Sequence, residues 1–262
     1  MISTKRFLLA AFLLALASAP AVHAQTPRIA KNQASERKTF TDAEITHGFF
    51  QVAFGAEFNL AGRTERIRKY DGPVRVYVDS RAKPDRRAQV AAIVADIRAR
   101  VDHLDIAMAD GRDSANVIVT LVRDRDLLPT IRKFFGSAKA QRIQRSLEPQ
   151  CLSGFRKDAD FRIVHSEVIA VADAGDFIFY DCMYEEILQA LGPINDTAAI
   201  PWTMFNDDVQ KGFFGRYDQY LLNILYDPRI RPGMTREEVR ALLPQVLPTV
   251  RNWVNRVNDA KP

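Results

Sequence analysis

The sequence predicts an α+β fold, in which helices pack on a mixed sheet whose elements follow an α/β-like order. Residues 74–78 alternate apolar and polar side chains, as a half-buried strand does, and residues 117–122 form the apolar run of a more buried strand. Between them, apolar residues recur with the period of an amphipathic helix that Pro84 opens. They are Val90, Ile93, Val94, Ile97, Val101 and Leu104.

Further elements are expected on both sides of this unit. Thr41 and Glu44 match a capping box, which starts a helix that ends near Gly55. The elements expected after residue 122 are two short helices, a strand and two longer helices, at 127–135, 138–147, 162–172, 176–191 and 217–226. Residues 235–262 are predicted to form C-terminal helices, which Pro244 and Pro248 are expected to break or bend.

Residues 1–24 have the pattern of a cleaved signal peptide. Lys5 and Arg6 precede an apolar run at 7–17, which is shorter than the roughly 20 residues of a membrane-spanning helix. We expect cleavage before Gln25, no membrane span in the mature chain, and a periplasmic or secreted protein. Residues 25–40 are polar and lack periodicity, so we expect a flexible leader.

The charge of the chain is nearly balanced. The formal net charge is +5, and removal of Lys5 and Arg6 with the signal peptide leaves +3. A balanced surface does not attract polyanions strongly. We therefore expect no nucleic-acid partner.

Two cysteines, Cys151 and Cys182, are present in the chain. In an exported protein, two cysteines are most simply one disulfide. Its loop of roughly 30 residues would contribute on the order of 3 kcal/mol to stability. The alternative, a cysteine metal site, would need further ligands at matching spacing, and the sequence offers none.

The segment from Glu185 to Asn195 has the spacing of the zinc-protease pattern H-E-x-x-H-x-x-G-x-x-H. Glu185, Gln189 and Asn195 occupy the three histidine positions. Glu186 stands where that pattern has its general base, and Gly192 where the helix ends. A Glu-Glu-x-x-Gln helix with a glycine stop is also common without any metal, so a helix that only packs and hydrogen-bonds remains an alternative.

Oxygen donors at these positions disfavour tight zinc binding. Carboxylate and carboxamide groups suit calcium or magnesium better. We therefore expect no zinc and no cofactor, with a weakly held divalent cation as the alternative. Glu186 is the candidate for any remaining proton chemistry.

Two features after this helix resemble metzincin-type zinc proteases. Met204 follows Asn195 in a polar turn, at the place of the methionine turn. Asp218 and Leu225–Tyr226 resemble the closing helix of matrixins. The resemblance implies a metzincin-like or zincin-like core at 41–234 with degenerate ligand positions, followed by a helical C-terminal part.

The chain also resembles an uncharacterised family of exported proteobacterial proteins, called domain of unknown function 2927. The motifs that carry this resemblance are Phe49-x4-Phe54-Gly55-x-Glu57, Glu185-Glu186-x-x-Gln189-x-Leu191-Gly192, Asn195-Asp196, Phe205-Asn206-Asp207 and Leu225-Tyr226-Asp227-Pro228-x-x-x-Pro232-Gly233-Met234. Membership would imply no established activity, and would make the replaced ligand positions a feature of the family.

Three functions are compatible with these observations. The leading hypothesis is an exported, catalytically silent zincin-like protein, or pseudoenzyme, that binds a peptide or an envelope protein. The second is an active, peptidase-like hydrolase that uses Glu186 with a non-zinc or weakly held metal. The third is an exported domain with a purely structural role.

Overall fold

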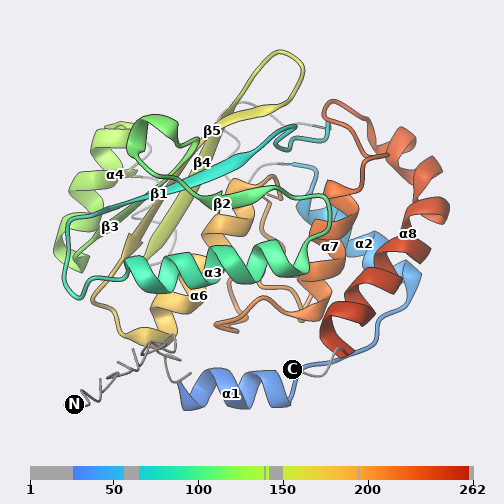
Figure 1. The fold of residues 1–262 in the computed structure, drawn as a ribbon, viewed down its shortest axis with the longest axis horizontal. Helices are drawn as coiled ribbons and strands as arrows, with labels where there is room; N and C mark the ends of the chain where they lie inside the picture. Colours follow the sequence, from blue (N-terminus) through green and yellow to red (C-terminus); the bar gives the residue numbers. More distant parts are fainter. Residues whose placement is uncertain (1–25, 56–64, 139, 142–149, 194, 260–262) are drawn as a thin grey trace, which may run out of the picture.

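The computed structural model describes residues 26–55, 65–138, 140–141, 150–193 and 195–259. The expected signal peptide and the cleavage point before Gln25 lie outside these ranges, as does most of the helix expected at 138–147. The described part forms a mixed five-stranded sheet with seven α-helices, which confirms the predicted fold class (Figure 1).

The sheet has the strand order β2-β1-β3-β5-β4. Four strands are parallel, and the edge strand β4 runs antiparallel to β5. The strand bounds are β1 Val74–Ser80, β2 Ile106–Met108, β3 Val117–Val122, β4 Cys151–Lys157 and β5 Ile163–Val171. Every residue of β3 is buried, as the unbroken apolar run predicts for a central strand with both faces covered.

The helices cover both faces of the sheet and extend beyond one end of it (Figure 1). Their bounds are α1 Pro27–Ala34, α2 Asp42–Val52, α3 Arg87–Arg100, α4 Leu127–Phe135, α6 Asp176–Ala190, α7 Arg216–Tyr226 and α8 Arg236–Asp259. Two short 3-10 helices, Arg112–Ser114 and Asp124–Asp126, flank β3.

Two apolar clusters follow from the alternation of side chains along the strands. On β5, Val168 and Ala170 belong to the larger cluster, on the side of α3 and α6. Ile169 and Val171 belong to the smaller cluster, which packs against α4. Helices α2, α7 and α8 contact one another and enlarge the first cluster beyond the sheet.

The leader expected to be flexible contains helix α1. Ile29 is buried, and the Asn32 side chain donates hydrogen bonds to the backbone of Gln210 and Lys211. The Glu36 carboxylate accepts a hydrogen bond from the Arg216 N–H at 2.6 Å, at the start of α7. A single apolar anchor gives little periodicity, which is why the sequence did not predict this helix.

Helix α8 continues through both prolines, so the expected break does not occur. Pro244 and Pro248 are one turn apart and lie on the exposed face. The opposite face is buried on the core through Val239, Leu243, Val246, Leu247, Val250 and Val254. Burial of this apolar face offsets the lost backbone hydrogen bonds, which cost about 3 kcal/mol for a proline in a helix interior.

The contribution of the α2 capping box to stability can be tested by varying the pH. Glu44 accepts hydrogen bonds from Arg37 and from the Thr41 N–H, and these interactions lower the pKa of Glu44 from 4.5 to about 2. A lowered pKa contributes stability that is present above pH 4.5 and is lost as the pH falls toward 2. Glu44→Gln should therefore lower the urea midpoint at pH 6, and the difference should narrow as the pH falls below 4.5. Glu237→Gln, in the first turn of α8, is the control. If Glu44→Gln lowered the urea midpoint by the same amount at every pH, the stabilisation could not come from the ionised Glu44 carboxylate.

Candidate functional site

Helix α6 carries the zinc-protease spacing and is fixed against the edge strand β4. The predicted disulfide between Cys151 and Cys182 is confirmed, and it joins β4 to the middle of α6. The hydroxyl of Ser153, two residues further along β4, donates a hydrogen bond to the side-chain oxygen Oε1 of Gln189 at 3.2 Å. The odd-numbered side chains of β4 thus face α6. On the opposite face, a Cβ at Gly154 would lie 3.1 Å from Phe135 at the end of α4.

The backbone of β4 has one paired and one outer edge. The Val171 N–H donates to the Gln150 carbonyl at 2.9 Å. Because antiparallel pairs alternate between bonded and non-bonded positions, the backbone groups of Cys151, Ser153 and Phe155 point away from β5. In the described ranges, no strand pairs with this outer edge.

Glu186 reaches the outer edge from α6. Ser153 makes a side-chain and a backbone hydrogen bond to its carboxyl group. The residue is only 6% exposed, and its Oε2 atom has no hydrogen-bond partner among the described residues. Burial, together with the nearby Asp196 and Asp207, raises the pKa of Glu186 to about 8.

Three carboxylates converge beside Glu186. Glu185, Asp196 and Asp207 each offer one oxygen, and these oxygens lie within 4.8 Å of one another. Glu185 and Asp196 are half-buried, and Asp207 is exposed. Burial raises the pKa of Glu185 well above its usual value, and the neighbouring carboxylates raise it further. An all-oxygen group of this kind suits hard cations and not zinc.

The loops after α6 bring these groups together. The Gln189 amide donates to Asp196 Oδ1 at 2.7 Å, which orients that carboxylate. The Thr197 N–H donates to the Phe205 carbonyl at 2.8 Å, so that the segments carrying Asp196 and Asp207 run side by side. Two loops and one helix thus build the cluster.

Asn195 lies elsewhere. Its amide donates to the Gln51 carbonyl at 2.7 Å, at the end of α2, and its backbone N–H donates to the Val52 carbonyl. A Cβ at Gly55 would lie 3.1 Å from its side-chain oxygen. The structure therefore brings Glu185 and Gln189 together with Asp196, while Asn195 holds the end of α2.

Gly192 allows the chain to turn after α6. Its φ of +139° is outside the range that L residues favour, and a Cβ there would lie 2.4 Å from the Arg68 carbonyl oxygen. Tyr226 of α7 donates to the Leu191 carbonyl at 2.9 Å and fixes the same turn.

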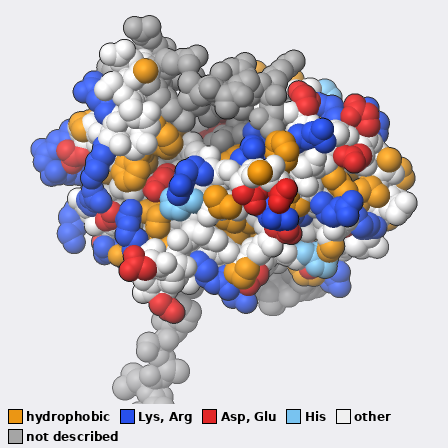
Figure 2. All heavy atoms as spheres, turned by 90° about the horizontal axis from the view of Figure 1, so that it is seen from above, with side chains coloured by type: hydrophobic (Ala, Val, Ile, Leu, Met, Phe, Trp, Pro, Cys, Tyr) orange, Lys and Arg blue, Asp and Glu red, His pale blue; other side chains and the backbone are white. Residues whose placement is uncertain are grey.

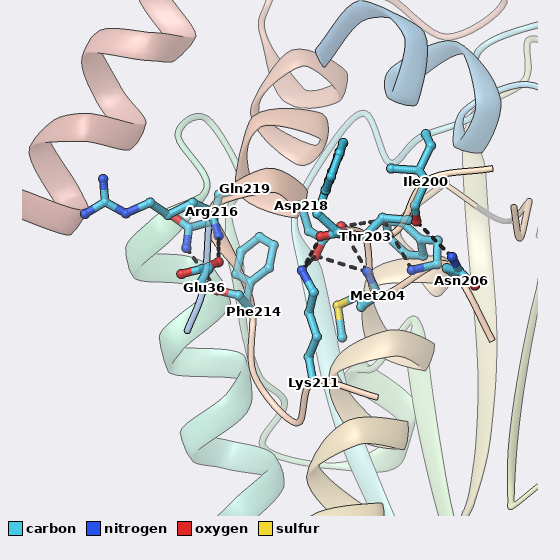
Figure 3. Close-up of polar contacts among 12 residues, drawn as sticks. Glu36, Ile200, Thr203, Met204, Asn206, Lys211, Phe214, Arg216, Asp218 and Gln219 are labelled. Atoms are coloured by element: carbon cyan, nitrogen blue, oxygen red, sulfur yellow. Dashed lines mark hydrogen bonds and ion pairs between the residues drawn. The ribbon is translucent and has the colours of Figure 1, made fainter. Parts of the chain in front are cut away.

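Met204 is buried in a turn that Asp218 of α7 holds (Figure 3). The Asp218 carboxylate accepts hydrogen bonds from the Thr203 hydroxyl at 2.6 Å and from the Met204 N–H at 3.2 Å. It also pairs with Lys211 Nζ at 3.4 Å. Burial raises the pKa of Asp218, and Lys211, Thr203 and Met204 act in the opposite direction.

The sequence did not predict Ser153, Asp196 or Asp207 as site residues. Asp196 and Asp207 stood in the motifs of the resembled family, but their convergence depends on loop geometry. Ser153 gave no signal, because β4 itself was not predicted.

No described helix is long and apolar enough to cross a membrane. On the face shown in Figure 2, basic and acidic side chains are interspersed.

One comparison with known proteins gave a match. The family described as "Protein of unknown function (DUF2927)" matches residues 42–245, which is most of the chain and extends into α8. No curated protein and no solved structure matches the chain.

A substitution that adds one methyl group tests whether Gly192 constrains the turn after α6. Gly192→Ala forces a strained φ and a clash with the Arg68 carbonyl, so it should destabilise the protein by about 2–4 kcal/mol in urea unfolding. Gly111→Ala is the control, because a Cβ at Gly111 meets no atom within 4 Å. Equal stability of the two variants would mean that Gly192 does not constrain the turn.

The buried pair of Asp218 and Lys211 can be tested by a double-mutant cycle. Asp218→Asn and Lys211→Met should each destabilise the protein by about 3–5 kcal/mol, since each leaves a buried charge without its partner. The double variant should lose clearly less than the sum of the two. Strict additivity in urea unfolding would show that the pair does not hold the Met204 turn.

Proposed function

Since this chain belongs to the DUF2927 family, whose function is unknown, we propose a function from its geometry: an exported, non-catalytic domain that binds an extended peptide segment of an envelope protein along β4. The observation that carries the proposal is the outer edge of β4, with which no described strand pairs and which runs beside the polar face of α6. Extended peptides bind such edges by adding a strand.

Export is supported by the signal-peptide pattern and by the disulfide between Cys151 and Cys182, which persists in oxidising compartments. A zincin-like ancestry is supported by the spacing of Glu185 and Gln189 on α6 and by the buried Met204 turn. We include it in the proposal as the origin of the peptide-binding edge.

Loss of catalysis is supported by two features of α6. The donors near the helix are oxygens, which hold zinc poorly. Glu186, at the position of the general base, is buried and hydrogen-bonded to the β4 edge at Ser153. The Ser153 hydrogen bonds hold this carboxyl group against the strand, and its burial keeps it from bulk water.

Peptide selection tests the proposal. A random dodecapeptide library is selected on the purified exported protein, and a binder is measured by isothermal titration calorimetry. N-methylation of two alternate amides that face β4 should weaken binding about 10-fold or more, since each backbone hydrogen bond contributes about 1 kcal/mol. N-methylation of the intervening amides is the matched control.

Three results would refute the proposal: no binder, equal effects of both methylation patterns, or cleavage of the bound peptide that Glu186→Gln abolishes. The last result would favour the active hydrolase. Mass spectrometry of the peptide after incubation distinguishes it from simple binding.

A further inference from the structure

We propose that Glu185, Asp196 and Asp207 form a calcium site at the end of α6. The three carboxylates come from the helix, from the loop after Gly192 and from the turn after Met204. The proposal is independent of peptide binding, because it rests on the geometry of these side chains alone.

The spacing of the oxygens fits calcium. Ca²⁺ holds oxygens at about 2.4 Å, so two ligands on opposite sides of the ion are up to about 4.8 Å apart. The three carboxylates offer oxygens within 4.8 Å of one another. Zinc prefers nitrogen and sulfur ligands, which none of these three side chains offers.

A second observation beside the cluster points to a ligand. Glu186 is 6% exposed, and its Oε2 atom has no hydrogen-bond partner among the described residues. Asp196 and Asp207 are its charged neighbours. A buried carboxylate oxygen normally has a partner. A water molecule of the coordination sphere would donate a hydrogen bond to Oε2, and Ca²⁺ usually retains such water ligands.

The surroundings orient the ligands and leave a path for the ion. Gln189 donates to Asp196, and Ser153 donates to Gln189, so a chain of hydrogen bonds connects β4 to one ligand. The exposed Asp207 gives access from solvent, and its turn is fixed by the Asn206 side chain, which donates to the Ile200 carbonyl at 2.9 Å.

Calorimetric titration of the purified, chelator-treated protein with CaCl₂ tests this site. Glu185→Gln and Asp207→Asn should each weaken calcium binding at least about 10-fold, because each removes a charged ligand. Asp208→Asn makes the same chemical change one residue away, outside the cluster, and should leave the affinity within about 2-fold. Without calcium, Glu185→Gln and Asp207→Asn should melt no lower than the unaltered protein, since each relieves repulsion.

The melting measurement separates loss of ligand from loss of fold. Calcium should raise the melting temperature of the unaltered protein and of Asp208→Asn, and should not raise that of the two ligand variants. Absence of binding at about 10 mM Ca²⁺, roughly ten times the dissociation constant of the weakest extracellular calcium sites, would overturn the proposal. So would binding that both ligand variants retain, or tighter binding of ZnCl₂ than of CaCl₂ in a parallel titration. No peptide is used, so failure here leaves the proposed function untouched.

Discussion

The arrangement of this protein depends on how helix α6 is fixed against the edge strand β4. The disulfide joins Cys151 to Cys182, and Ser153 contacts Glu186 and Gln189. Positions 182, 186 and 189 share one face of the helix, as the 3.6-residue period requires. Alternate residues of β4 lie along that face. One covalent bond and a few hydrogen bonds therefore set the position of every polar group that α6 presents to the edge.

Two buried carboxyl groups of the domain are stabilised in different ways. Asp218 has a hydroxyl, a backbone N–H and a lysine as partners, so its ionised form is compensated within the core. The carboxyl group of Glu186 contacts Ser153 and lies near the carboxylates of Asp196 and Asp207. Burial of a charge is costly without a counter-charge. The Asp218 network therefore reads as structural, whereas burial beside further carboxylates raises the pKa of Glu186 to about 8 and favours its neutral form.

The sequence predicted the elements with strong periodicity. β1, β3, α6 and α7 match the expected ranges closely, because their apolar spacing reflects a buried face. Helix α3 is shorter than predicted: it begins at Arg87 and not at Pro84, and it ends at Arg100, before Val101 and Leu104. β4 was not predicted, since it includes Ser153, Gly154 and exposed basic residues, and only its pairing with β5 makes it a strand. The continuity of α8 depended on tertiary burial, which outweighs the local effect of its prolines.

At the site, the spacing of residues in the sequence predicted which side chains lie together on helix α6, but not which ones meet in the loops after it. Glu185 and Gln189 are one turn apart, so the helix itself places them on one face. After Gly192 the backbone is irregular, and neighbouring residues point in different directions. Asn195 therefore binds the end of α2 while Asp196, the next residue, joins Glu185. Asp207 enters from a separate turn. The groups that converge here are all oxygens, drawn from three segments, which is the pattern of a site built for a hard cation.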